Sequence, residues 1–187
     1  MPLHNQTGTT AESPVCVLGP VDADAMVAHL QALGREERAF RLHTTSAATD
    51  VLREAARRML VAGLCYGIRE PATGRLVYLG QAVPSDRPGG LELAFSATPD
   101  ARGGLTFRTL AWLLPRAAAQ GVRFLELRFN PFNPAIAGLL ARLGWRREVF
   151  GDDNRAVFDV PREPSAVVAQ VNAWLQAAQD RGSIARL

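Results

Sequence analysis

Lysine is absent from this sequence, and all 21 of its basic residues are arginine. The protein therefore has no lysine side chain of its own to be modified. The formal net charge is only +3, and no recognition motif or basic stripe accompanies it, which argues against nucleic-acid binding. No apolar run approaches the ~20 residues that a membrane-spanning helix requires, so we expect no membrane partner.

Cysteine is also scarce. The two thiols, Cys16 and Cys65, lie in apolar, strand-like contexts, so we interpret them as core residues in a reducing compartment. Their spacing and neighbours indicate no metal site. The first thirteen residues are polar and lack the basic start and apolar segment of a signal peptide. We therefore expect a cytoplasmic protein whose residues 1–13 form a flexible arm.

The composition is that of an ordinary globular protein. Of 187 residues, 48% are apolar and 21% are charged, which is enough to bury the core of one domain. The first half predicts one strand, two helices and three consecutive strands. The strands are expected at 14–18, 64–69, 76–83 and 91–97, and the helices from Asp22 or Asp24 to Leu33 and from Thr49 or Asp50 to about Ala62.

The second half alternates between helix and strand. A helix from Leu105 carries Pro115, which predicts a kink or a break. The next helix has Asn133 as N-cap and Pro134 at its first position, and a last helix is expected to begin at the cap Ser165 and to end at 179. Strands are expected at 122–129, 145–150 and 156–160. This order predicts an α/β (α+β) fold with a mixed sheet flanked by helices.

Two blocks of sequence support a family resemblance. One is Ala101-Arg102-Gly103-Gly104-Leu105-Thr106, which follows a strand; the other is the segment from Asn133 to Gly144-Trp145. The first is similar to the phosphate loop of the GNAT superfamily of acyl-CoA N-acyltransferases, and the second to its Asn-(x)10-Gly-Phe ending. Residues 33–43, with Arg38 and Phe40, resemble a segment of bacterial GNAT domains related to protein-lysine acetyltransferases.

The sequence departs from the family pattern at two places. The phosphate loop is one residue short, and Thr106 stands where the family prefers Gly or Ala. Leu140 stands where many members carry a Tyr that protonates the leaving thiolate, although the bacterial branch that residues 33–43 resemble often lacks this Tyr. The resemblance covers about residues 14–160, which we expect to form a GNAT-like domain with a centrally splayed sheet. Residues 161–187 would add a C-terminal helix and a tail.

The resemblance also implies how acetyl-CoA would bind. Pantetheine would lie between the strands at 91–97 and 122–129, and one backbone N–H there would hold the thioester oxygen. A glycine turn before a helix has free N–H groups that bind anions, so the loop would hold the pyrophosphate, with Arg102 adding a charged contact. The cofactor-binding residues expected on this basis are Phe95, Ser96, Ala97, Arg102, Gly103, Gly104, Leu105, Thr106 and Asn133.

The catalytic base is expected to be a carboxylate. Glu92 stands where relatives carry a Glu, and partial burial among apolar neighbours would raise its pKa toward a useful value. Glu126, on the adjacent strand, is the competing candidate. Asn133 has two roles open to it, the N-cap of its helix and a contact to CoA. His29 is expected on the polar side of its helix and therefore away from catalysis.

Two functions of different classes fit these residues. The first is an N-acetyltransferase that moves an acetyl group from acetyl-CoA to a primary amine of a small molecule or a protein. The alternative is a CoA-binding regulatory module with weak or no catalysis, which the short loop and the missing Tyr favour. The acceptor is not indicated by the sequence. The apolar face of the last helix is expected to be buried on its own domain or in a homodimer.

Overall fold

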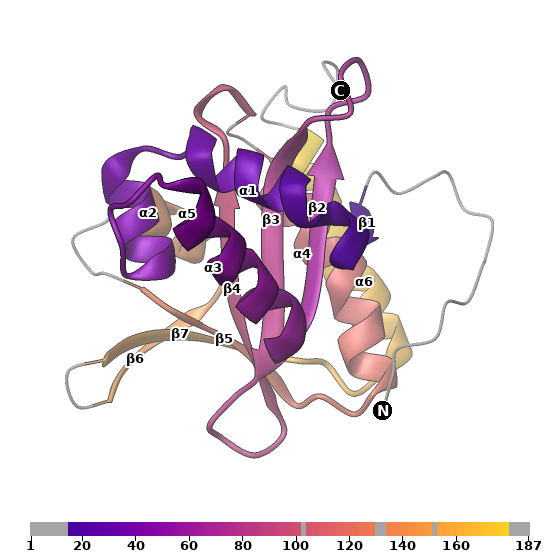
Figure 1. Cartoon of the computed structure of the whole chain (residues 1–187). Helices are drawn as coiled ribbons and strands as arrows, with labels where there is room; N and C mark the ends of the chain where they lie inside the picture. The colour runs from indigo at the N-terminus through magenta and orange to yellow at the C-terminus, as the bar shows by residue number, and fades with distance from the viewer. Residues whose placement is uncertain (1–14, 102–103, 130–133, 151–152, 180–187) are drawn as a thin grey trace.

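Seven strands form one mixed sheet in a computed structural model that describes residues 15–101, 104–129, 134–150 and 153–179 (Figure 1). The strand order is β1-β2-β3-β4-β5-β7-β6, and all neighbours are antiparallel except β4 and β5. The strands are β1 (Val15–Leu18), β2 (Leu64–Arg69), β3 (Leu76–Pro84), β4 (Gly90–Ala97), β5 (Phe124–Arg128), β6 (Arg146–Phe150) and β7 (Asp153–Asp159).

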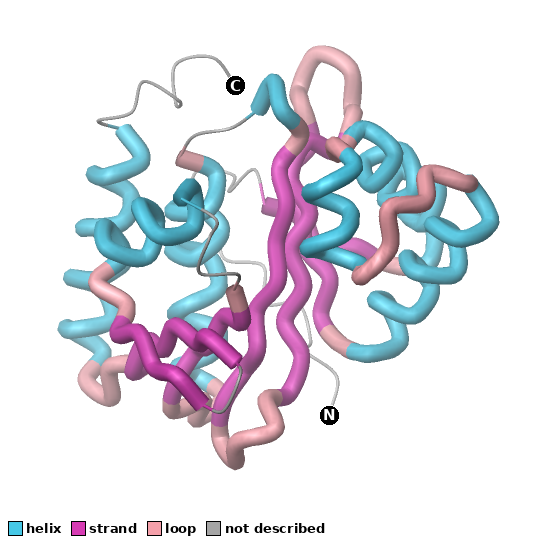
Figure 2. Tube along the Cα trace, turned by 90° about the vertical axis from the view of Figure 1, so that its left-hand side faces the viewer, coloured by secondary structure: helices cyan, strands magenta, loops and turns pink. Residues whose placement is uncertain are grey.

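Helices cover both faces of this sheet (Figure 2). On one face α1 and α3 pack on β1–β3, and α2 packs on β4. On the other face lie α4, α5 and α6, with α6 packed along α4. The helices are α1 (Ala23–Ala32), α2 (Arg35–Leu42), α3 (Thr49–Ala62), α4 (Leu105–Ala119), α5 (Pro134–Leu143) and α6 (Pro164–Gln179), with 3₁₀ turns at Pro20–Asp22 and Pro99–Ala101.

The larger core lies on the α4 side of the sheet. Tyr66 packs its ring flat on Gly80, where an added Cβ would lie 2.2 Å from the ring, so only glycine fits at that position. Trp174 of α6 is 2% exposed and contacts Phe158, with 5.0 Å between the ring centroids. The apolar face of the last helix is therefore buried on its own chain.

The β4–β5 pair holds the irregularity that matters for function. Its parallel register covers only three rows, Gly90 with Phe124 to Glu92 with Glu126. Beyond that row β4 continues to Ala97 against β3, and β5 continues to Arg128 against β7. Over residues 93–97 the edge of β4 that faces β5 thus has no strand partner among the described residues. The expected splay is present at the centre of the sheet.

Most of the expected elements are found, with one helix that was not predicted and two details that differ. Residues 35–42 form a helix, α2, for which the sequence analysis predicted no secondary structure. Pro115 does not break α4, which runs on to Ala119. The last helix begins at Pro164 and not after a Ser165 cap, because proline is well suited to the first turn, where its missing N–H costs nothing.

Candidate functional site

Two carboxylates mark the row at which β4 and β5 separate. Glu92 and Glu126 are register partners, so their side chains leave the sheet on the same face. The hydrogen bonds of β4 and its neighbour β3 to helices identify this face. Ser96 contacts His29 of α1, and Gln81 donates to the Met59 carbonyl of α3. Both acids therefore lie on the α1–α3 face of the sheet.

Glu92 is partly exposed and has a raised pKa. Its side chain is 27% exposed, and its Oε2 lies 3.1 Å from Nε of Arg128. Burial raises the pKa of Glu92 most, Arg128 opposes this, and the negative charges of Glu126 and Asp86 raise it further. A raised pKa and access to solvent are the properties that a general base requires.

Glu126 has the opposite surroundings. It is fully buried, and its Oε1 accepts a 2.6 Å hydrogen bond from the Ser85 hydroxyl. Its Oε2 lies 3.5 Å from Arg155 and 3.7 Å from Arg87. A carboxylate held in this way has no surface to offer a substrate. Among the two candidates, the geometry favours Glu92 as the reacting group.

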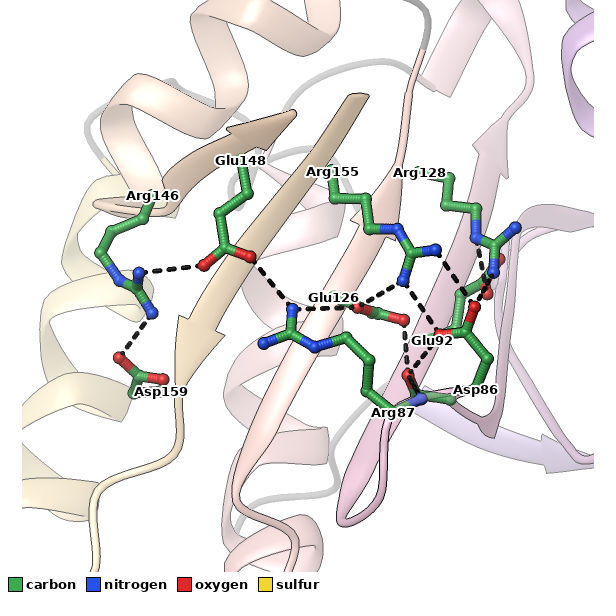
Figure 3. A network of polar contacts seen from close by, with 10 residues as sticks. Asp86, Arg87, Glu92, Glu126, Arg128, Arg146, Glu148, Arg155 and Asp159 are labelled. Atoms are coloured by element: carbon green, nitrogen blue, oxygen red, sulfur yellow. Dashed lines mark hydrogen bonds and ion pairs between the residues drawn. The ribbon is translucent and has the colours of Figure 1, made fainter. Parts of the chain in front are cut away.

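A chain of ion pairs joins these two acids (Figure 3). Asp86, from the β3–β4 loop, binds both terminal nitrogens of Arg155, at 2.9 and 3.1 Å. The same carboxylate lies 3.0 Å from Arg128, which also pairs with Glu92. The charge partner of Glu92 is therefore shared with a second acid, and the pKa of Glu92 depends on the whole cluster.

The ion pairs continue across β6 and β7. Arg87 lies 3.1 Å from Glu148, which lies 3.0 Å from Arg146, and Arg146 lies 3.0 Å from Asp159. We call the nine residues of this chain the ion-pair network. Its members are Asp86, Arg87, Glu92, Glu126, Arg128, Arg146, Glu148, Arg155 and Asp159.

The end of β4 contains a polar pair that the sequence analysis misjudged. His29 is 2% exposed, so the expectation that it lies on the polar side of α1 was wrong. The packing of α1 against β3 buries it, and its ring bonds the Leu76 carbonyl at 3.0 Å and Ser96 Oγ at 2.9 Å. Burial lowers the pKa of His29 to about 4. Next to this pair, Phe95 stacks on Tyr78 with centroids 6.1 Å apart, and Ala97 ends the strand.

The expected phosphate loop enters α4 through a glycine. Gly104 is the N-cap of α4 and has a left-handed backbone, with φ of 63°, which favours glycine. Leu105 is buried in the core, whereas Thr106 is partly exposed. The backbone N–H groups that follow Gly104 open α4 and have no partner within the helix. They can therefore bind an anion, as the expected phosphate loop requires. Arg102, Gly103 and Asn133 lie outside the described residues.

Two further observations bear on the chemistry. Leu140 of α5 is 1% exposed, so the position that carries Tyr in many relatives of the resembled family is a core residue here. Cavities of about 360 and 890 Å³ lie elsewhere, the first between α1 and α3 and the second beside Arg123 and Pro161. Neither cavity includes Glu92 or Ser96, and the candidate site is defined by the splayed strands and their side chains.

Several solved structures are similar to this chain, and their names describe GNAT domains or acetyltransferases. The GNAT domain of S. lividans PAT is similar with a TM-score of 0.64 at 19% identity, over 78% of this chain and 89% of that one. A GCN5-related N-acetyltransferase from Brucella melitensis gives 0.66 at 17% identity, over 86% and 81%. An acetyltransferase of the GNAT family from Streptococcus pneumoniae gives 0.59 at 15%, over 79% and 98%.

The sequence comparisons add nothing to this likeness. No family model matches the chain, and no curated protein matches it. The structural similarity, together with the splayed β4–β5 pair and the glycine entry to α4, shows that the chain has the GNAT acetyltransferase fold. The resemblance inferred from the two sequence blocks is thereby confirmed at the level of the fold.

Proposed function

We propose that this protein transfers an acetyl group from acetyl-CoA to a primary amine, with Glu92 as general base. The observation that carries the proposal is the position of Glu92 in the row where β4 and β5 part. A carboxylate there, partly exposed and with a raised pKa, stands beside the strand edge that would bind pantetheine. Phe95, Ser96 and Ala97 supply that edge.

Acetyl-CoA fits the groups that the structure provides. The open edge of β4 offers backbone N–H groups to the pantetheine and to the thioester oxygen. Gly104, Leu105 and Thr106 open α4, and their N–H groups with those of Arg102 and Gly103 would bind the pyrophosphate. Asn133 retains both of its proposed roles, as a helix cap and as a contact to CoA.

The reaction then needs few groups from the protein. Glu92 takes up one proton from the ammonium form of the acceptor, relayed through water along β4, and the neutral amine attacks the thioester carbon. The C–N bond forms, the C–S bond breaks, and the second N–H proton passes to the CoA thiolate. Because Leu140 has no proton to give, we assign the amine itself as the source of that proton.

Replacement of the base tests this proposal. Glu92→Gln keeps the shape of the side chain and removes its basicity, so turnover should fall by about 100-fold or more. The calorimetric affinity for acetyl-CoA should hardly change, since the carboxylate does not bind CoA in this proposal. Glu163→Gln, the same change at an exposed position, is the matched control. Unchanged turnover of Glu92→Gln at every pH would refute the role of Glu92.

One observation favours the alternative, a CoA-binding module without turnover. Arg128 lies 3.1 Å from Glu92, and a permanently paired carboxylate is a weaker base. Calorimetry combined with detection of free CoA thiol separates the two functions. Binding of acetyl-CoA without thiol release across a broad panel of amines would favour the module, and release of thiol with any of them would favour the enzyme.

A further inference from the structure

The guanidinium of Arg41, on α2, is largely buried and has no counter-ion among the described residues. Nε and Nη2 of Arg41 are inaccessible to solvent and have no hydrogen-bond partner. Arg41 forms no ion pair with any residue that the structure describes; its electrostatic neighbours are Cys65, Tyr66 and Tyr78, all neutral. Burial of an unpaired guanidinium is costly. A buried polar group left unsatisfied in a native protein needs an explanation, and an ion that binds there is one such explanation.

The nearest acid on the same helix is already engaged. Glu37 accepts a 2.9 Å hydrogen bond from the backbone N–H of Gly34 at the start of α2. Arg38, one turn before Arg41, donates to the Gln31 and Leu33 carbonyls at the end of α1. Arg38 thus has a structural role in joining α1 to α2, whereas the guanidinium of Arg41 is left for a ligand.

The His29–Ser96 pair adds a hydrogen-bond acceptor of fixed direction. Nδ1 of His29 faces the Leu76 carbonyl, which only accepts, so Nδ1 carries the proton. Since burial keeps the ring neutral, Nε2 accepts the hydroxyl hydrogen of Ser96. The Ser96 oxygen can therefore offer only lone pairs to a ligand, and it suits an N–H donor such as an ammonium group.

These two features lie near one another beside β4, the strand that also carries Glu92. The positive charge of Arg41 acts on the His29 ring, and that ring bonds Ser96, so all three belong to one region between α1, α2 and β4. The expected phosphate loop, by contrast, opens α4, which covers the other face. An anion at Arg41 is therefore better placed on the acceptor than on the pyrophosphate of CoA.

We infer that the acceptor is an amine that also bears a carboxylate, as in an amino acid, with the carboxylate paired to Arg41 and the ammonium held by Ser96. This inference rests on the proposed function, because it assigns the substrate class of the same site. It explains why Arg41 has no acidic partner among the described residues, and why the nearby Ser96 hydroxyl already donates its hydrogen to His29. A guanidinium donor and a hydroxyl acceptor arranged in this way are complementary to a zwitterion.

A panel of L-amino acids and their carboxamides tests the inference, since each pair differs only in the charge of one group. Wild-type protein should acetylate the acids with a kcat/KM higher than that of the amides by about tenfold or more. Arg41→Met should remove this preference and leave the amides and the calorimetric affinity for acetyl-CoA unchanged. Arg35→Met, an exposed arginine of the same helix, should behave as the wild type.

Thermal shift provides a readout that does not need turnover. The acids should raise the Tm of the wild type and not that of Arg41→Met, and the amides should raise neither. Equal shifts for acids and amides in the wild type would overturn the inference, as would an Arg41→Met variant that weakens acetyl-CoA binding. If acids stabilise only the wild type but no thiol is released, the carboxylate pocket stands and the proposed transfer fails.

Discussion

The α1–α3 face of the sheet carries two polar regions that treat buried charge in opposite ways. In the ion-pair network, every buried ionic group has a partner of opposite sign; Glu126 lies near both Arg87 and Arg155. In the region between α1, α2 and β4, Nε and Nη2 of Arg41 are buried, and no residue that the structure describes forms an ion pair with Arg41. The two regions lie at opposite ends of β4, one at Glu92 and the other at Ser96.

This difference in charge pairing distinguishes groups that stabilise the fold from groups that could bind a ligand. Opposite charges offset one another in the network, which joins the β3–β4 loop, β5 and β7 and modulates the pKa of Glu92, raised chiefly by burial. An unpaired charge contributes a cost to the folded chain and a gain only when an anion arrives. We therefore interpret the ion-pair network as a group that stabilises the fold and modulates the pKa of Glu92. We interpret the Arg41 region as the part that binds the acceptor.

The same substitution, Arg→Met, should lower stability in the network and should not lower it in the Arg41 region. Arg155→Met removes the bidentate partner of Asp86 and the closest cation of Glu126. Loss of one member of a buried pair costs about 3–5 kcal/mol of unfolding free energy. Arg41→Met removes a buried, unpaired charge, so it should leave the unfolding free energy unchanged or higher. Urea unfolding of both variants measures the contrast.

A second substitution shows whether Arg155→Met loses stability through the unpaired charge of Glu126 or through poorer packing. Adding Glu126→Gln to Arg155→Met removes the stranded negative charge, so the double variant should regain part of the lost stability. A double variant no more stable than Arg155→Met would mean that charge pairing is not what holds the network. A large loss of stability in Arg41→Met would mean that this guanidinium has a structural role.

His29 gives a prediction about pH for the recognition region. Its pKa is lowered to about 4 from 6.5 because burial disfavours the charged ring. As pH falls from 6.5 toward 4, the unfolded chain gains a proton that the folded protein does not. The unfolding free energy should therefore fall by up to about 3 kcal/mol over this window, and it should be independent of His29 above it.

Comparison with His29→Asn isolates this contribution. Asn keeps a donor for the Leu76 carbonyl and cannot take up a proton, so this variant should lack the pH-dependent loss between 6.5 and 4. Acidic groups of low pKa, such as Asp86 and Asp100, affect both proteins alike. Unfolding curves at a series of pH values supply the test, and equal slopes for the two proteins would contradict it.

Much of the fold was open to prediction from the sequence because its signals are local. The alternation of residues 64–69 and the apolar stripe of α4 each follow from the geometry of one element. The two blocks of family resemblance then predicted the splay between β4 and β5, which the structure shows. Helix α2 was missed because its charged residues mask a short amphipathic pattern, and its place is decided by packing on β4.

The candidate site was less accessible to prediction because it depends on contacts between distant segments. Glu92 was selected by resemblance, but its partners Asp86, Arg128 and Arg155 lie in other elements that the sequence does not align. His29 looked exposed on a helix of weak amphipathicity, and only the docking of α1 on β3 reveals its burial. Arg41 lies in the family-like segment 33–43, but its lack of an acidic partner is recognisable only after its neighbours are known.

An exposed ion pair should contribute much less to the unfolding free energy than the buried ion pairs of the network. Arg53 and Asp24 join α3 to α1 at 3.4 Å, with side chains 60% and 88% exposed. Solvent screens such a pair, so Arg53→Gln should change the unfolding free energy by less than about 0.5 kcal/mol. Urea unfolding at low and high salt should show no more than a small dependence on salt for this variant relative to wild type. An effect as large as that of Arg155→Met would show that exposure does not separate weak from strong pairs here, and the contrast between network and surface would fail.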